Sequence, residues 1–355
     1  MTKLLMLSNI PAPYQLDFFG ALAKNADVLA VFLQERETNR DWELDNKDWV
    51  RILGCSRGYS KWAELRGIIN QFEPDHVIVG GYRLSLSLKL KWYCFRRGIP
   101  FYYWLEKPLP SNRVRKIIRY LVWMLTLPFA RGVFCIGKEA MSAYKFFSKR
   151  VINLPYSIDA SRYCQRNKLI NKPLKCLYIG QYITRKGIQE LLLGFSKIST
   201  DQATLTIVGS GEMKAEISFY TKKYSHIKEV GFLSPDQLPS IISQHDLLIA
   251  PSRHDGWAVV LVEAMISGLP VISTSNTGAF VELVELNGLE RSGTLCEVDP
   301  ESIRDAIIGY VEDPDRISRE GACARKKVLN SHAESKNAAK YLLTILSQNL
   351  IKEMN

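Results

Sequence analysis

The chain has 355 residues, of which 46% are hydrophobic and 23% charged, and 47 Lys and Arg against 36 Asp and Glu leave a formal net charge of +11. This length favours two domains. The composition is that of a folded protein and excludes disordered, collagen-like and coiled-coil chains. The excess of positive charge indicates an anionic partner, which could be a nucleic acid, a phosphorylated small molecule or an acidic membrane surface.

The cysteines and the apolar runs predict a cytoplasmic protein. The seven cysteines are scattered and form no CxxC pair, which indicates a reducing compartment. Residues 1–10 lack the long apolar region of a signal peptide. The longest apolar run, residues 121–130, contains Pro128 and is too short to span a bilayer.

Short apolar segments alternate with helical patterns along the whole chain. We predict strands at residues 3–8, 28–32, 76–79, 101–104 and 132–136, and a second series at 175–179, 204–208, 247–250 and 270–273. Helical patterns include 14–24, 188–199, 213–224, 238–243, 259–267 and a last stretch at 319–354. Continuous apolar strands separated by helices favour parallel sheets covered on both faces. The sequence therefore predicts an α/β protein with two doubly wound halves, at residues 1–165 and 170–330.

The turn after the predicted strand 175–179 carries two cations and opens a helix. It contains Gly180, Gln181, Arg185, Lys186 and Gly187. Backbone N–H groups at a helix start add to the charge of Lys and Arg, so the turn resembles an anion site. A solvated basic turn is the alternative. The next turn, with Gly209, Gly211 and Glu212, could be a structural turn or a ligand loop.

A third turn follows the predicted strand 247–250 and holds two carboxylates eight positions apart. Asp255 precedes the helix, where carboxylates cap free N–H groups. Glu263 lies in an apolar helix, where a carboxylate needs a polar partner. The pair could hold the hydroxyls of a sugar-like ligand, and a cap with a helix-face Glu is the alternative.

Taken together, residues 176–284 resemble the donor half of glycosyltransferase family 4. The pair Lys186-Gly187 resembles the family's Arg-x4-Lys-Gly diphosphate loop, residues 209–212 its G-x-G-E turn, and Asp255-x7-Glu263 its E-x7-E signature. Weaker resemblance covers residues 11–14, 74–75 and 155–159. Two positions depart from the family: Gln181 replaces the loop Arg, whose charge Arg185 could supply, and Asp255 replaces the first Glu.

The resemblance implies a GT-B fold, with two Rossmann-like domains facing a central cleft and a C-terminal helix, residues 335–355, crossing back to the N-terminal domain. It implies metal-independent hexosyl transfer with retention from a nucleotide-diphosphate sugar, UDP rather than GDP or ADP, without a cofactor. The acceptor would be a saccharide or a lipid-linked saccharide, in polysaccharide, lipopolysaccharide or glycolipid assembly. A nucleotide-sugar epimerase or glycosyl phosphorylase of the same fold is the alternative. A nucleic-acid-binding protein and a non-catalytic scaffold are further alternatives.

The resemblance also implies site residues. The family has a His near the reaction centre in its N-terminal half, and here Glu106 follows the corresponding predicted strand, while His76 is interpreted as structural. We expect catalytic roles for Asp255, Lys186, Arg185 and Glu106, and donor contacts from Gly180, Gln181, Gly209, Gly211, Phe232, Gly256, Trp257, Ala258, Val259 and Glu263. For the acceptor we expect Tyr14, Gln15, Tyr82 and Arg83.

The positive charge is confined to the first half of the chain. Residues 83–150 hold 15 Lys and Arg against two acids, a net of +13, which leaves −2 for the rest. Aromatic residues such as Trp92, Phe95 and Trp123 are interleaved with these cations. Basic residues beside aromatics predict peripheral binding to an anionic membrane, here the inner face of the cell membrane. A solvated basic face is the alternative.

Overall fold

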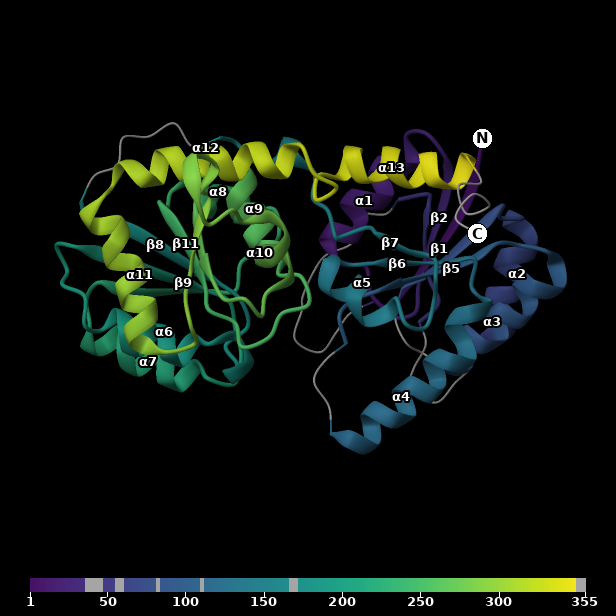
Figure 1. Ribbon diagram of the computed structural model, residues 1–355, viewed down its shortest axis with the longest axis horizontal. Coiled ribbons are helices and arrows are strands. Elements are labelled where there is room, and N and C mark those ends of the chain that lie inside the picture. The colour runs from purple at the N-terminus through teal and green to yellow at the C-terminus, as the bar shows by residue number, and fades with distance from the viewer. Residues whose placement is uncertain (36–46, 55–60, 81–83, 109–111, 166–171, 349–355) are drawn as a thin grey trace. The chain divides into compact units, whose positions relative to one another are not determined.

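The computed structural model describes residues 1–35, 47–54, 61–80, 84–108, 112–165 and 172–348. The chain forms two compact units (Figure 1). Unit 1 comprises Met1–Ser157 together with Ser335–Asn355, and unit 2 comprises Ile158–Glu334.

Unit 1 is built on a parallel sheet of seven strands in the order β3-β2-β1-β4-β5-β6-β7. Both faces of β1 are covered: Leu4, Leu5 and Met6 are all at most 1% exposed. Such burial on both sides explains the continuous apolar strands of the sequence. The strands are β1 (Lys3–Ser8), β2 (Asp27–Phe32), β3 (Val50–Ile52), β4 (His76–Gly80), β5 (Phe101–Leu105), β6 (Gly132–Cys135) and β7 (Val151–Asn153).

Helices from both ends of the chain cover the unit 1 sheet (Figure 1). α13, near the C-terminus, packs along α1, and both belong to unit 1. α13 buries Ala338, Leu342 and Ile345. The helices are α1 (Pro13–Ala23), α2 (Trp62–Phe72), α3 (Leu84–Arg97), α4 (Arg113–Thr126), α5 (Lys138–Tyr144) and α13 (Ser335–Ser347), with a 3-10 turn η1 (Leu127–Phe129).

Unit 2 repeats the architecture with six parallel strands in the order β10-β9-β8-β11-β12-β13. The strands are β8 (Leu174–Ile179), β9 (Ala203–Val208), β10 (Ile227–Gly231), β11 (Leu247–Ala250), β12 (Val271–Ser273) and β13 (Gly293–Leu295). The helices are α6 (Ile188–Phe195), α7 (Lys214–Lys223), α8 (Leu238–Ser243), α9 (Val259–Ile266), α10 (Gly278–Leu283), α11 (Pro300–Glu312) and α12 (Asp315–Leu329). Three 3-10 turns are η2 (Ala160–Arg162), η3 (Thr184–Lys186) and η4 (Gly288–Glu290).

The prediction of two doubly wound parallel sheets is confirmed. In each sheet the chain order reverses once, between β1 and β4 in unit 1 and between β8 and β11 in unit 2. Ligands of such sheets bind outside the carboxyl ends of the strands at this reversal. Site residues are therefore expected at these two sheet edges.

The prediction of one helical stretch at residues 319–354 is wrong. α12 ends at Leu329 and α13 begins at Ser335. Between them the Ala333 carbonyl accepts from the Ile158 amide at 3.0 Å, and Ile158 forms a parallel bridge with Glu334. The backbone between α12 and α13 therefore pairs with a distant segment of the chain, and no Gly or Pro in the sequence marks the break. Residues 349–355 lie outside the described residues.

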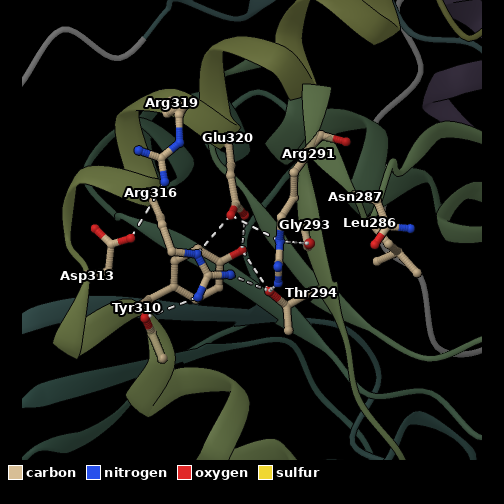
Figure 2. Close-up of polar contacts among 12 residues, drawn as sticks. Leu286, Asn287, Arg291, Gly293, Thr294, Tyr310, Asp313, Arg316, Arg319 and Glu320 are labelled. Atoms are coloured by element: carbon tan, nitrogen blue, oxygen red, sulfur yellow. Dashed lines mark hydrogen bonds and ion pairs between the residues drawn. The ribbon is translucent and has the colours of Figure 1, made fainter. Parts of the chain in front are cut away.

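A buried carboxylate ties α11 and α12 to the edge strand β13 (Figure 2). Glu320, 1% exposed, accepts from Arg316 Nε at 2.8 Å and from the Tyr310 hydroxyl at 2.6 Å. Arg291 Nε lies 3.2 Å from the same carboxylate. Thr294 on β13 accepts from both guanidinium groups at 3.0 Å. A buried charge with this many partners holds its surroundings in one arrangement, because losing a partner leaves the charge unpaired.

Candidate functional site

The predicted donor residues lie on loops at the carboxyl edge of the unit 2 sheet. The loop after β8 carries Arg185 and Lys186, and the loop after β11 carries Asp255. Since β8 and β11 are neighbours at the reversal of strand order, the two loops meet. The sequence separates Lys186 and Asp255 by 69 positions, and the fold brings them into contact.

Lys186 and Asp255 form an ion pair between the two loops. Their side chains are 19% and 13% exposed. Burial alone would raise the pKa of the Asp255 carboxyl, but the ammonium of Lys186 and its hydrogen bond, with smaller contributions from Arg185 and the Trp257 amide, lower that pKa below its ordinary value. The pair therefore presents a charged lysine and a charged carboxylate at the sheet edge.

The loop after β11 is shaped by Asp255 itself. Its Oδ1 accepts from the backbone amides of Ala258 at 2.9 Å and Trp257 at 3.3 Å. Trp257 and Ala258, two of the predicted donor contacts, thus already bond this carboxylate through their backbone amides. Ala258 has a left-handed φ of 63° and precedes α9, which begins at Val259. Gly256 lies so close to the start of α10 that a Cβ on Gly278 would stand 2.2 Å from its carbonyl oxygen.

Gly187 permits the approach of the two loops. Its φ is 68°, in the region that favours glycine. A Cβ at this position would stand 2.0 Å from the carbonyl oxygen of Pro251, in the loop after β11. Gly187 also ends the 3-10 turn that carries Arg185 and Lys186. The glycine of the basic turn therefore has a structural reason as well as a place at the site.

Two further cations, Arg185 and Arg253, lie on the two loops that carry this ion pair. Arg185 Nη1 donates to the His254 carbonyl at 2.8 Å, and the Arg253 amide donates to the Arg185 carbonyl at 2.9 Å. Arg253 also forms an ion pair with Glu190 on α6. Arg253 and Glu190 were not predicted from the sequence. These contacts join the two loops, and the three cations outnumber the two carboxylates paired with them by one, an excess of positive charge that suits an anionic ligand.

The glycine turn after β9 packs directly on the loop after β8. A Cβ on Gly209 would stand 1.9 Å from the Gly180 carbonyl oxygen, and one on Gly211 would stand 2.6 Å from that of Tyr182. The carbonyl of Gln181 accepts from the Tyr178 hydroxyl at 3.0 Å. Phe232, 44% exposed, follows β10 at the same edge. The structure thus gathers these predicted donor residues at the carboxyl edge of one sheet.

Glu263 has the polar partner that its apolar helix requires. The Tyr163 hydroxyl donates to Glu263 Oε1 at 2.9 Å. Tyr163 is 3% exposed and lies 100 positions away in the chain. No motif points to Tyr163, so it could not be selected from the sequence. The contact fixes the carboxylate on α9.

In unit 1, three predicted residues lie at the carboxyl edge of the sheet. Gln15 is buried and its Nε2 donates to Ser8, the last residue of β1, at 2.9 Å. The ring of Tyr14 lies 4.3 Å from that of Tyr156. Burial raises the pKa of Tyr156 well above its ordinary value, and the charge of Glu106 and the neighbouring Tyr14, both also hydrogen-bonded to Tyr156, raise it further.

Glu106 directly follows β5 and is exposed. Its backbone carbonyl accepts from the Tyr144 hydroxyl at 2.9 Å. Tyr156, which joins Glu106 to Tyr14, was not selected from the sequence. The predicted acceptor residues Tyr82 and Arg83 lie outside the described residues.

His76 lies at the opposite edge from these groups. It is the first residue of β4, and its ring lies 5.8 Å from that of Tyr102. Burial lowers the pKa of His76, an effect that the nearby Asp75 partly offsets. Its position at the amino end of a strand agrees with the structural interpretation made from the sequence.

Within the described residues, no three His, Cys, Asp or Glu side chains gather where they could hold a metal ion. In the same part of the chain, none of the helices has the length and apolar character needed to cross a membrane.

Most of unit 2 matches the model of a known protein family. Residues 161–327 match the family model for Glycosyl transferases group 1. An N-acetyl-alpha-D-glucosaminyl L-malate synthase from Bacillus anthracis is 26% identical over 208 residues, 58% of this chain and 53% of that protein. The lipopolysaccharide core biosynthesis mannosyltransferase LpsB from Rhizobium meliloti is 36% identical over 78 residues, 22% of each chain. The chain spans about half or less of the length of these two curated relatives.

Structural likeness extends over both units. The crystal structure of Anabaena Alr3699/HepE in complex with UDP has a TM-score of 0.77 at 15% identity, over 98% of this chain and 100% of that one. At this identity the likeness shows the fold. The predicted GT-B fold is therefore confirmed, and residues 161–327 match the Glycosyl transferases group 1 model.

Proposed function

We propose that the chain is a retaining glycosyltransferase of family 4, which transfers a hexosyl group from a nucleotide-diphosphate sugar to a saccharide or lipid-linked saccharide. The observation that carries the proposal is the ion pair of Lys186 and Asp255 at the strand-order reversal of a Glycosyl transferases group 1 domain. One loop offers cations for a diphosphate, and the facing loop offers a carboxylate for sugar hydroxyls. Unit 2 is thus the donor side and unit 1 the acceptor side.

The diphosphate is the leaving group, and its growing negative charge needs compensation. Lys186 and Arg185 supply this charge without a metal, and the half-buried setting strengthens their effect. Lys186 contacts the Asp255 carboxylate, which holds its ammonium in position. Positive groups that are already in position contribute most to stabilising the leaving group, because they need no rearrangement during the reaction.

The remaining donor contacts follow from the same edge. Asp255 orients the sugar, and Glu263, held by Tyr163, binds the ribose hydroxyls. Gly209 and Gly211 let their turn pack on the loop of Gly180, because a Cβ on either would meet the backbone of that loop, and the nucleotide is proposed to bind at the edge that these loops form. Phe232 offers an exposed ring on which a base can stack. UDP is the proposed nucleotide, which agrees with the UDP bound to the Anabaena neighbour.

The acceptor is proposed to bind at the carboxyl edge of the unit 1 sheet. Glu106 takes the place of the family's His near the reaction centre, and Tyr14 and Gln15 contact the acceptor, with Tyr82 and Arg83 as further contacts predicted from the sequence. Tyr156 is hydrogen-bonded to both Glu106 and Tyr14, which supports the proposal that these two side chains belong to one acceptor site. In a retaining reaction the acceptor oxygen bonds to the anomeric carbon on the face that the diphosphate leaves.

We also propose that the protein binds an anionic membrane through the basic segment 83–150, next to a lipid-linked acceptor at the inner face of the cell membrane. The net charge of +13 on this segment supports the proposal. The likeness to LpsB, which is described as a lipopolysaccharide core enzyme, agrees with polysaccharide or glycolipid assembly.

Nucleotide binding is tested first by thermal shift with UDP, GDP and ADP, then with the corresponding sugars. A nucleotide at a hundred times its Kd stabilises the fold by about 2.7 kcal/mol. We expect the largest shift with UDP, in buffer containing EDTA. A shift that disappears with EDTA refutes metal independence, and no shift with any nucleotide refutes the proposed donor class.

Transfer is tested with Asp255→Ala, with Glu290→Ala as the matched control. Glu290 is also a carboxylate of unit 2, but its side chain is 74% exposed. We expect the Asp255 variant to lose transfer at least about a hundredfold, as when a positioned electrostatic group is removed. The anomeric configuration of the product, read by NMR, tests retention. Turnover of the nucleotide sugar into an epimer without any acceptor, or phosphate-dependent cleavage, would instead support the alternative activities.

A further inference from the structure

Helix α4 carries an exposed apolar stripe. The stripe comprises Val114, Ile117, Ile118, Leu121, Met124 and Leu125, whose exposed fractions run from 51% for Leu121 to 69% for Leu125. These positions recur at three- and four-residue spacing, which places them on one face of a helix. Six large apolar side chains exposed together on a single helix face indicate an interaction surface rather than scattered exposure.

The stripe is not the face by which α4 packs on unit 1. Trp123 and Thr126 are buried, at 2% and 5% exposed, and lie on the other side of the helix. Lys91 Nζ on α3 donates to the Leu125 carbonyl at 3.3 Å, so α3 adjoins the end of α4. The face of α4 that carries Trp123 is therefore covered by unit 1, whereas the stripe on the other face is exposed.

Cations open α4 at one end of the stripe, and exposed aromatic rings lie on α3. Arg113, Arg115 and Lys116 in the first turn of α4 are exposed, whereas Arg119 lies over the Trp123 ring on the covered side. Neither α3 nor α4 contains an Asp or Glu. On α3, Trp92 and Phe95 are 66% and 74% exposed, with ring centroids 6.1 Å apart. An apolar face flanked by cations and large aromatics is the pattern of helices that lie in a membrane interface.

We propose that the α4 stripe inserts into the acyl region of an anionic lipid bilayer, with α4 lying in the plane of the membrane. The inference rests on the membrane association proposed above, and it adds that insertion of this helix, beyond attraction to the basic segment, supplies the anchor. The long side chains of Arg113, Arg115 and Lys116, at one end of the stripe, reach anionic headgroups while their stems lie on apolar surface.

A second copy of the chain fits this surface less well. Two such faces brought together would place cations against cations with no acid on either helix, and like charges in an interface disfavour association. An anionic lipid surface satisfies both features of the face, because it offers hydrocarbon to the stripe and negative charge to its borders. The charge complementarity therefore selects lipid as the occupant.

The test is vesicle flotation of the full chain and of the triple variant Ile117→Gln, Leu121→Gln, Leu125→Gln. Phosphatidylcholine vesicles are used with and without phosphatidylglycerol, at about 0.1 M and about 0.5 M NaCl, where screening shortens the reach of surface charge severalfold. We expect the wild type to bind the anionic vesicles and to retain part of this binding at high salt. We expect the triple variant to bind at least about tenfold more weakly, because burial of each such side chain favours insertion.

The control variant is Val281→Gln, Leu289→Gln, which removes exposed apolar side chains of unit 2. It should bind vesicles like the wild type. Three results overturn the inference: equal vesicle binding by wild type and triple variant, complete loss of wild-type binding at high salt, or lipid-free self-association that the triple variant abolishes. The UDP thermal shift of the triple variant should equal that of the wild type. If the triple variant shows a normal UDP shift and unchanged vesicle binding, only the membrane role of the stripe is rejected. If the wild type shows no UDP shift, the proposed donor site is rejected instead.

Discussion

Replacing Lys186 with methionine leaves the Asp255 carboxylate at the sheet edge without the ammonium that contacts it. Breaking a buried ion pair by removing one partner costs about 3–5 kcal/mol. Because the side chains of Lys186 and Asp255 are still 19% and 13% exposed, we expect the free energy of unfolding to fall by about 3 kcal/mol at neutral pH, near the lower end of this range. Arg185 and the Trp257 amide remain and offset part of the penalty.

The pH dependence of this loss has a defined sign. In the wild type the folded-state pKa of Asp255 is lowered, so its contribution to stability is present above the unfolded pKa and is lost as the pH falls through the folded pKa. In Lys186→Met, the ammonium that lowers the pKa of Asp255 is missing, so the effect of burial raises the folded-state pKa of this carboxyl. The destabilisation should therefore shrink by about 1–2 kcal/mol as the pH falls from 7 towards 4, where the carboxyl begins to take up its proton.

The assay is urea unfolding of the full chain between about pH 4 and pH 7. The double variant Lys186→Met, Asp255→Asn serves as the control, because it lacks the titrating carboxyl. The difference between the single and the double variant isolates Asp255. If both variants lose stability in parallel across this pH range, the reasoning about the ion pair is refuted.

Three further variants test other contacts. Gly187→Ala should destabilise the fold by more than about 2 kcal/mol and weaken the UDP thermal shift, whereas Gly288→Ala, with a similar φ of 69° but open space around its Cβ, should lose only about 1 kcal/mol. Tyr163→Phe should cost about 1 kcal/mol and weaken the UDP shift, and an unchanged shift would contradict its role in holding the α9 carboxylate. Glu320→Gln should lower stability in urea by about 3 kcal/mol, whereas Arg319→Ala, whose ion pair spans 3.6 Å at about half exposure, should lose less than about 1 kcal/mol.

Local patterns in the sequence were enough to predict the layers of the fold. Leu4, Leu5 and Met6 form an uninterrupted apolar strand because helices cover both faces of the sheet, and this burial is visible as composition. The break between α12 and α13 was missed, because its hydrogen bonds go to Ile158, far away in the chain. Helix ends held by distant partners leave no local pattern.

The residues of the candidate site were chosen from motifs, but their contacts depend on the tertiary structure. The sequence indicates that Glu263 needs a polar partner, yet nothing in it identifies Tyr163, which lies 100 positions away. The pairing of Lys186 with Asp255 depends on which strands are neighbours, and strand order is a property of the whole sheet. The amides of Trp257 and Ala258, two residues predicted to contact the donor, are hydrogen-bonded to Asp255 in the folded loop.

The positive charge shows the same division between sequence and structure. The residue counts alone assign the charge to the segment 83–150 and predict a basic surface. Only the structure shows that α4 turns Trp123 inward and leaves Leu121 and Leu125 exposed. An apolar residue in a sequence is equally compatible with a core and with a surface, since periodicity defines a helix face but not what covers it. Composition and pattern therefore determined the layers and the chemistry available, whereas packing decided which groups meet and which remain exposed.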